Sequence, residues 1–393
     1  MQLTFFDSPS AWQKMLPLTY TRPVAELRVG ILKIHEKWRK LLGGKITTFR
    51  TRVYLNDLFP IPKTKTLTIL GNVLPTRELT EILSTMAGNE VVVSGQQLIA
   101  GYFNPNEEFA VGSRRKVEIK KIEKINYPWD IFSKNGMEII KDYELITKDR
   151  TSESLKDKHT RTYGKEIFLE EGTKIKAAIL NAENGPIYLG KGSEIQEGAL
   201  IRGPFVLGDQ SVVNMGAKMR GDTTIGPYSK VGGEISNSVI QGYSNKGHEG
   251  FLGNSVLGEW CNLGAGTNNS NLKNNYTNVK MWDFESHKFK DTGLQFCGLI
   301  MGDHSKCGIN TLFNTGINIG VSANIFGEGF LKDIIPSFSW GGASGFLTYE
   351  LRKVFETAKR VMSRRDKELT NSYEAMISHI FEITSKYRVW ENK

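Results

Sequence analysis

The stretch that decides the fold is residues 187–232, IYLGKGSEIQEGALIRGPFVLGDQSVVNMGAKMRGDTTIGPYSKVG. An apolar residue recurs there at every sixth position, in the series Leu189, Ile195, Ile201, Leu207, Val213, Met219, Ile225 and Val231. The residue two places earlier is mostly small, and the residue just after is often Gly or Asn. This pattern is typical of a hexapeptide-repeat β-helix, in which three hexapeptides close one triangular coil around an interior ladder of apolar side chains.

The repeat is interrupted twice. The position expected after Val231 holds Asn237, and the phase returns only at Leu257, 26 residues after Val231. A second gap of 38 residues separates Leu263 from Met301. Neither separation is a multiple of six, so we expect each gap to carry a loop that leaves the coil. Solenoids of this type commonly associate side by side, so we also expect a homotrimer.

The regions before and after the repeat have different patterns. Residues 1–155 mix short apolar runs, such as 67–70 and 91–93, with helical stretches at 29–42 and 76–86. That mixture predicts a Rossmann-like α/β domain. We expect a left-handed parallel β-helix over 156–335, then a C-terminal cap with amphipathic helices over 336–393.

Composition limits the class of protein. The chain has 393 residues, 39% of them hydrophobic, and contains no apolar run near about 18 residues and no leader-like start. Its three cysteines form no metal-spaced pair and predict reduced thiols in a cytoplasmic protein. The net charge of +9 suits either an anionic small molecule or a well-solvated surface. We expect neither nucleic acid nor a membrane as a partner.

A histidine lies in the first interruption, within the segment NKGHEG (245–250). Two interpretations of His248 are open. It is either an inert residue of a solvated loop or a general base that takes a proton from a nucleophile attacking a thioester. The flanking Gly247 and Gly250 would allow close approach of a ligand to the backbone.

The segment 247–271, GHEGFLGNSVLGEWCNLGAGTNNSN, resembles the acetyltransferase motif of a known family. This is the bifunctional N-acetylglucosamine-1-phosphate uridyltransferase/glucosamine-1-phosphate acetyltransferase family. The resemblance implies that acetyl-CoA is a substrate, that it binds between neighbouring subunits, and that His248 is the catalytic base. The other site residues that it implies are Asn262, Asn271 and Glu234 for substrate, and Gly264 and Ala265 for acetyl-CoA.

Three positions depart from the family's motif. Phe251 stands in place of a tyrosine, Asn254 in place of an aspartate, and Ile309 in place of a serine. These differences leave the acceptor sugar and the acyl group open.

The N-terminal region resembles the sugar-1-phosphate nucleotidyltransferases in the segment 17–34, PLTYTRPVAELRVGILKI. The family's phosphate loop would fall here, with Arg22 and Arg28 suited to phosphate oxygens; structural salt bridges are the competing interpretation. The sequence GNVLP at 71–75 places Asn72 where the family carries its Mg²⁺-binding aspartate. An amide oxygen is the weaker ligand, so Asn72 is only a weak candidate metal residue.

These observations support one leading hypothesis and three alternatives. The leading hypothesis is acetyl transfer from acetyl-CoA to an amino sugar phosphate, with nucleotidyl transfer from UTP, Mg²⁺-dependent if the head is active, to give UDP-N-acetylglucosamine. The alternatives are a regulatory protein with a degenerate nucleotide-sugar-binding head, a nucleotidyltransferase acting only on another sugar-1-phosphate, and a zinc hydratase. The zinc hydratase would use His248, His287 and His304 as ligands.

Overall fold

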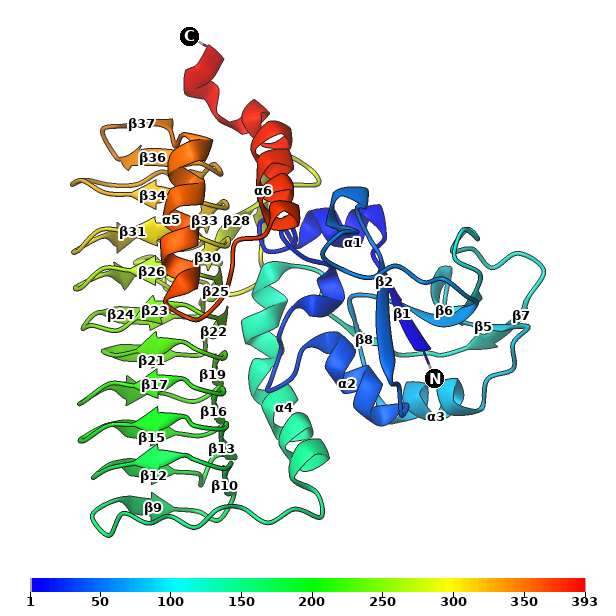
Figure 1. The fold of residues 1–393 in the computed structure, drawn as a ribbon, viewed down its shortest axis with the longest axis horizontal. Helices are drawn as coiled ribbons and strands as arrows, with labels where there is room; N and C mark the ends of the chain where they lie inside the picture. The colour runs from blue at the N-terminus through cyan, green and yellow to red at the C-terminus, as the bar shows by residue number, and fades with distance from the viewer. Residues whose placement is uncertain (1, 393) are drawn as a thin grey trace. The chain divides into compact units, whose positions relative to one another are not determined.

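The computed structural model describes residues 2–392, which form two compact units (Figure 1). The first unit consists of the residues up to Leu27 together with Leu32–Tyr127. The second unit consists of Arg28–Ile31 and the chain from Pro128 onward. No helix among residues 2–392 is long and apolar enough to cross a membrane.

The first unit is built on a mixed six-stranded sheet with the order β2-β1-β3-β6-β5-β7. Its strands are β1 (Gln2–Phe6), β2 (Ile46–Arg50), β3 (Thr66–Leu70), β5 (Glu90–Ser94), β6 (Gln97–Phe103) and β7 (Arg115–Glu118). Its helices are α1 (Pro9–Lys14), α2 (Ile34–Leu41) and α3 (Arg77–Thr85), and a short pair joins β4 (Val73–Leu74) to β8 (Glu123–Lys124). Every residue of β3 is buried, as expected for a central strand covered on both faces. The predicted α/β head is therefore confirmed.

The second unit contains the β-helix, whose coils stack three sheets of parallel strands, except that the last strand of the ten-stranded sheet is antiparallel to its neighbour. One sheet has nine strands: β10 (Ile167–Leu169), β13 (Ile187–Leu189), β16 (Phe205–Leu207), β19 (Thr223–Ile225), β22 (Val239–Gly242), β25 (Val256–Glu259), β30 (Ile300–Met301), β33 (Asn318–Ile319) and β35 (Ile334–Ile335). A second has ten: β11 (Lys174–Ile175), β14 (Glu194–Ile195), β17 (Val212–Val213), β20 (Lys230–Val231), β23 (Asn245–Lys246), β26 (Asn262–Leu263), β31 (Lys306–Cys307), β34 (Asn324–Ile325), β36 (Ser339–Gly342) and β37 (Gly345–Thr348). The third has six: β9 (Arg161–Tyr163), β12 (Ile179–Asn181), β15 (Leu200–Arg202), β18 (Lys218–Met219), β21 (Glu234–Ser236) and β24 (Phe251–Gly253), with a separate pair formed by β27 (Asn268–Asn269) and β32 (Leu312–Phe313).

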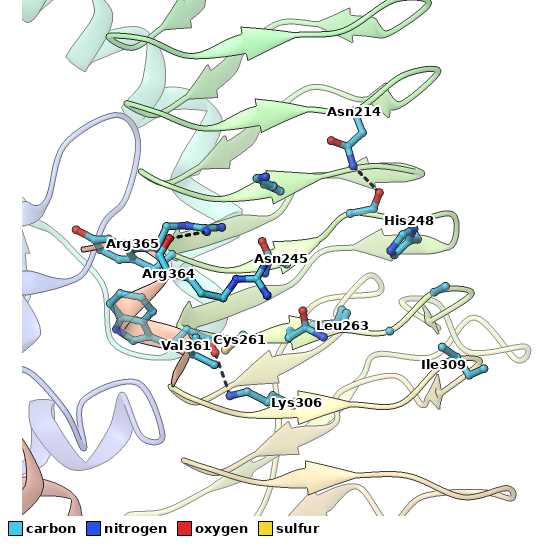
Figure 2. Close-up of a pocket in the computed structure, with 17 residues that line it drawn as sticks. Asn214, Asn245, His248, Cys261, Leu263, Lys306, Ile309, Val361, Arg364 and Arg365 are labelled. Carbon is cyan, nitrogen blue, oxygen red and sulfur yellow. Dashed lines mark hydrogen bonds between the residues drawn. The ribbon is translucent and has the colours of Figure 1, made fainter. Parts of the chain in front are cut away.

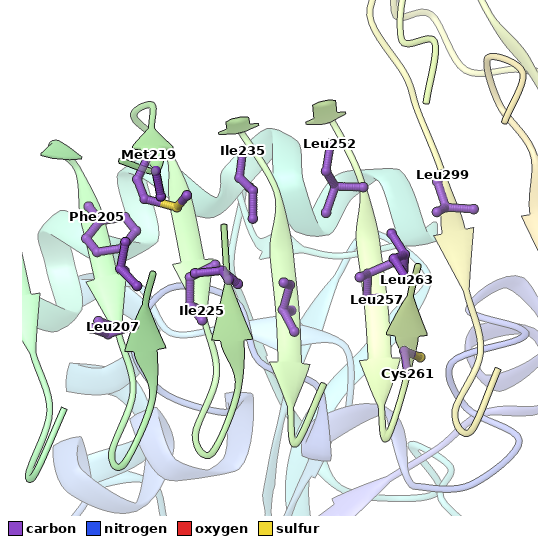
Figure 3. Packing of buried hydrophobic residues seen from close by; sticks show 14 of the residues in the cluster. Phe205, Leu207, Met219, Ile225, Ile235, Leu252, Leu257, Cys261, Leu263 and Leu299 are labelled. Atoms are coloured by element: carbon purple, nitrogen blue, oxygen red, sulfur yellow. The ribbon is translucent and has the colours of Figure 1, made fainter. Parts of the chain in front are cut away.

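The periodic apolar residues form the interior ladder, as the sequence predicts. None of the eight residues from Leu189 to Val231 in this series is more than 2% exposed, and all belong to one buried cluster (Figure 3). Leu207 pairs with Leu189 below it and with Ile225 above it, so three hexapeptides make one coil. Together with the α/β head and the C-terminal helices, these stacked sheets confirm the predicted left-handed β-helix fold.

The first interruption of the repeat does not carry a loop, so the expectation of one there is wrong. Ile235, Ile240, Lys246 and Leu252 continue the interior ladder, and each pairs with the interior residue of the coil before. The interior positions are closer in sequence there because the corners are short. Gly233 and Asn237 have φ of 67° and 44°, a left-handed backbone that turns the chain within few residues.

The second interruption does leave the coil. Between β27 and β30 the chain forms an antiparallel hairpin of β28 (Lys280–Asp283) and β29 (Lys288–Asp291). The expectation of an insertion between Leu263 and Met301 is therefore met.

Helix α4 (Pro128–Thr147) belongs to the second unit, where it contacts strands β16, β19, β22 and β25. Its Asn135 side chain donates to the Asp222 carbonyl (2.9 Å). The C-terminal helices α5 (Leu351–Ser363) and α6 (Asn371–Ile383) belong to the same unit. These compact units differ from the divisions placed at 155 and 335 by sequence, because α4 packs on the coils although it precedes them in the chain.

Candidate functional site

A cavity of about 630 Å³ lies on the outer face of the ten-stranded sheet (Figure 2). Successive strands present one outward residue each to this cavity, because side chains alternate between the two faces of a strand. These residues are Lys230, Asn245, Asn262 and Lys306, and each is paired in register with the next. Val361, Arg364 and Arg365, at the end of α5 and just beyond it, line the cavity as well.

His248 lies at one end of the cavity, in the turn 247–250 between β23 and β24. Its side chain is exposed, while the turn that carries it is firmly held: the Asn214 side-chain amide donates to the Gly247 carbonyl (2.7 Å). Gly250 has φ of 123°, and a Cβ there would lie 2.0 Å from the Thr267 carbonyl oxygen, so the turn requires glycine. The turn thus presents an accessible imidazole on a fixed backbone.

Asn262, Gly264 and Ala265 line the same cavity as His248. The Gly264 N–H donates to the Cys307 carbonyl (3.1 Å), so it is used within the β-helix. Among residues 2–392, the Ala265 N–H has no hydrogen-bond partner. Four of the residues named from the sequence therefore meet at one site, and one of them offers a free main-chain donor.

The other end of the cavity is cationic, a feature that the sequence did not reveal. Lys230, Lys306, Arg364 and Arg365 line the cavity, and none of its lining residues is acidic. The Lys306 ammonium donates to the His304 carbonyl (2.8 Å), and burial lowers the pKa of Lys306 to about 8. Figure 2 shows Arg364 and Arg365 on the side of the cavity away from His248 and Ile309.

A stack of aromatic rings forms the corner of the coils beside this cationic end. The ring centroids of Tyr228, Tyr243, Trp260 and His304 follow one another at 5.2, 4.3 and 6.1 Å. His304 Nε2 lies 2.9 Å from the Tyr373 hydroxyl of α6, which fastens that helix to the corner. Each stacked residue comes three positions after an interior residue, in the order Ile225, Ile240, Leu257 and Met301. This spacing could have predicted the aromatic stack from the sequence.

Two other predicted substrate residues do not line this cavity. Glu234 lines a separate cavity of about 400 Å³ on the six-stranded sheet of the β-helix, where it forms an ion pair with Arg220 (3.1 Å). The Asn271 side chain donates to Asn254 Oδ1 (2.7 Å). The structure therefore brings together His248, Asn262, Gly264 and Ala265, and not Glu234 or Asn271.

The two arginines named for phosphate binding belong to different compact units. Arg22 is buried in the first unit, at 6% exposure. Arg28 belongs to the second unit, where its N–H donates to Gln241 Oε1 (2.7 Å) and its carbonyl accepts from Gln241 Nε2 (3.2 Å). The Arg28 guanidinium donates to the Ile31 carbonyl, a main-chain contact and not a salt bridge.

Asp7 is a buried group in the head that the sequence analysis missed. It directly follows β1, and its carboxylate accepts from the Val24 N–H (3.1 and 3.2 Å) and the Thr51 hydroxyl (2.6 Å). Burial raises the pKa of Asp7 to about 7. Asp7 thereby anchors the segment that contains Arg22. The position of Asp7, an acidic residue just after the first buried strand, could have indicated this buried group from the sequence.

Asn72 does not by itself supply a metal site. It is 4% exposed; its Nδ2 donates to the Ile125 carbonyl (2.8 Å), and its Oδ1 has no partner among residues 2–392. Magnesium sites that are completed by substrate phosphates use one or two carboxylates, and Asn72 offers only an amide oxygen. Nor does any group of three or more His, Cys, Asp or Glu in the described chain suit a metal, which weighs against a zinc site of His248, His287 and His304.

The fold defines a class of protein: a nucleotidyltransferase-like α/β unit followed along the chain by a left-handed β-helix, which carries the cavity on one face. Comparison with known proteins agrees. Residues 3–151 match the family described as sugar nucleotidyl transferase. A bifunctional sugar-1-phosphate nucleotidylyltransferase/acetyltransferase of Sulfurisphaera tokodaii is 34% identical over 160 residues, which cover 40% of this chain and 37% of that protein.

Two proteins named bifunctional protein GlmU are also similar. The one from Methanocaldococcus jannaschii is 32% identical over 87 residues, 22% of this chain and 21% of the relative. The one from Methanococcus aeolicus is 30% identical over 120 residues, 30% of this chain and 25% of the relative. The matches thus span between about a fifth and two fifths of these proteins' lengths. The resemblance to this group of proteins, predicted from the sequence, is confirmed over the matched parts of the chain.

Proposed function

We propose that this protein is an enzyme of sugar-nucleotide biosynthesis that transfers an acetyl group from acetyl-CoA to the amine of a glucosamine-1-phosphate-like sugar. The observation that carries the proposal is the cavity on the ten-stranded sheet. It combines an exposed imidazole, a free main-chain donor and a cationic end within about 630 Å³, a volume suited to a small-molecule ligand.

His248 acts as the general base of this reaction. The sugar amine attacks the thioester carbonyl carbon, a C–N bond forms, and the C–S bond breaks to release the coenzyme A thiolate. His248 takes the proton from the amine and can return it to the leaving sulfur. The Ala265 N–H is available to the thioester oxygen as negative charge develops on it, and Asn262 contacts the substrate.

The cationic end of the cavity receives the phosphates of acetyl-CoA. Lys306, Arg364 and Arg365 offer charged donors that suit phosphate oxygens. No lining carboxylate opposes an anion there. The coenzyme then extends along the sheet with its thioester towards His248.

The head is proposed to transfer a nucleotidyl group from UTP to the sugar-1-phosphate, giving a UDP-N-acetylglucosamine-like product. The family match over residues 3–151 supports this activity, as does the anchored segment that carries Arg22. The absence of a carboxylate at Asn72 favours a second candidate function for the head, the binding of a nucleotide sugar without catalysis.

We propose a cytoplasmic homotrimer with functional divisions near residues 155 and 335. The six-stranded sheet of the β-helix supports side-by-side assembly, because two of its apolar side chains, Ile179 and Leu200, are 39% and 45% exposed. All three cysteines are free and buried, as in a reducing compartment. Glu234 and Asn271, which do not line the cavity of one chain, would contact substrate only in such an assembly.

Two assays test the activities separately. Release of free coenzyme A from acetyl-CoA and glucosamine-1-phosphate tests the β-helix, and no release with any amino sugar phosphate would exclude acetyl transfer. Release of pyrophosphate from UTP and N-acetylglucosamine-1-phosphate, with and without Mg²⁺, tests the head. Binding of UDP-sugars without pyrophosphate release would identify the head as a sensor.

A further inference from the structure

A lysine occupies an interior position of the β-helix directly beneath the turn that carries His248. Lys246 pairs with Val231 in the interior ladder and is 1% exposed. Its ammonium donates to the His248 carbonyl at 2.6 Å. An apolar side chain would fit this ladder, as Val231 and Leu263 do on the adjacent coils, and burying an ammonium is costly. Stability alone therefore does not account for a lysine here.

The contact belongs to a set that immobilises the whole turn. The Gly247 carbonyl accepts from the Asn214 side chain, the Glu249 carbonyl from the Gly266 N–H (3.0 Å), and the Gly250 carbonyl from the Glu234 N–H (3.1 Å). The fourth carbonyl, that of His248, is held by Lys246. All four carbonyls of 247–250 are thus bound, and the one on the candidate base is bound by the only charged donor.

We infer that Lys246 is a positioning residue, which from inside the coil fixes the His248 backbone and so directs the imidazole into the cavity. Its part in acetyl transfer rests on the proposed function. The fixed backbone itself does not, and it can be tested without turnover.

The test compares Lys246→Met with the wild type in the full chain. Methionine fills the ladder position and removes the donor. Ile195→Met is the matched control, because Ile195 lies in the same ladder three coils away from Lys246 and is fully buried. Hydrogen exchange should become about tenfold faster at the Glu234 and Gly266 amides, which donate to the Gly250 and Glu249 carbonyls of the turn, in Lys246→Met only, because the turn loses its hydrogen bond to a charged group. Unchanged exchange in folded Lys246→Met would overturn the inference.

The kinetic readout separates positioning from stability. The kcat of acetyl transfer should fall by about ten- to a hundredfold with the KM for acetyl-CoA within about twofold, because a misplaced base slows the reaction without removing the coenzyme contacts. Faster exchange with an unchanged kcat would overturn the positioning role. If the wild type transfers no acetyl group, the proposed function fails, and the exchange comparison still decides whether Lys246 fixes the turn.

The wild-type protein supplies a second measurement in case Lys246→Met does not fold. Reductive methylation followed by peptide mass spectrometry should modify Lys230, which is exposed in the cavity, and spare Lys246. Modification of both lysines at the same rate would show that Lys246 is not held inside the coil, and would refute the inference.

Discussion

Replacing Lys246 by methionine should raise the stability of the protein at neutral pH and should do so less as the pH rises. Burial lowers the pKa of Lys246 to about 8 from an ordinary 10.5, while the nearby Glu249 and Cys307 oppose this effect. The unfolded chain therefore binds a proton at Lys246 more tightly than the folded protein does. Between about pH 8 and 10.5 the unfolded state holds more protons, so this lysine makes the protein less stable below that range and ceases to do so above it.

The magnitude follows from the two pKa values. A change from 10.5 to about 8 corresponds to about 3 kcal/mol of unfolding free energy at pH 7. Because Lys246→Met removes the titrating group, the unfolding free energy of the variant minus that of the wild type should fall by about 3 kcal/mol from pH 7 to above pH 10.5. Nearly half of this fall should occur by pH 9.

Urea unfolding of both proteins at pH 7, 8 and 9, followed by circular dichroism, measures this difference. The subtraction matters because the buried cysteines Cys261 and Cys297, whose pKa values burial raises, destabilise both proteins alike above about pH 9. The Ile195→Met control should show a difference that does not depend on pH. A pH-independent difference for Lys246→Met would refute the assignment of a charged, buried lysine.

The remaining predictions concern the cavity, the core and the head. His248→Ala should lower the kcat of acetyl transfer by about 10²–10⁴-fold without changing the melting temperature, because we propose His248 as the general base and its side chain is exposed. The Arg364→Ala/Arg365→Ala variant should raise the KM for acetyl-CoA about tenfold at low salt and less at 0.5 M salt, as kinetics at the two salt concentrations would show. Ile240→Ala should cost about 2–5 kcal/mol in urea unfolding, because Ile240 is fully buried in the ladder. The unfolding free energy of Asp7→Asn minus that of the wild type should rise by about 3 kcal/mol between pH 4 and pH 7 in urea unfolding, because the folded pKa of Asp7 is about 7 against an ordinary 3.8; an equal difference at both pH values would contradict this.

The β-helix could be predicted from the sequence because this fold requires particular residue types at fixed positions of each coil. An interior residue such as Ile225 must be apolar, and the corner after it must turn sharply, so both constraints appear in the printed sequence. The same periodicity failed at Asn237, where a corner of left-handed φ shortened the coil and moved the interior positions to Ile235 and Ile240. Counting in sixes cannot detect a coil that closes with fewer residues.

The candidate site was predictable at one end only. His248, Asn262 and Ala265 lie within one short segment whose motif could be compared with a known family. Arg364 and Arg365 come from the end of α5, far along the chain, and no local pattern tells a helix end over the sheet from one that faces solvent. Arg28 shows the same limit: the Gln241 side chain holds its main chain, and this contact leaves no trace in the sequence pattern.

Two buried ionisable groups, Lys246 and Asp7, resemble each other in their pKa shifts and in their contacts with the backbone. Lys246 at the end of a strand in the β-helix and Asp7 just after a strand in the head both have a pKa shifted by burial towards the neutral form. Each binds the backbone of a segment named as functional, His248 in one case and the chain that carries Arg22 in the other. Neutral or apolar substitutes would be more stable at pH 7, so both groups lower stability while fixing a local backbone. In a β-helix, whose faces are flat, a turn immobilised at a corner can hold a side chain over the sheet, and Lys246 holds the turn of His248 from inside the coil.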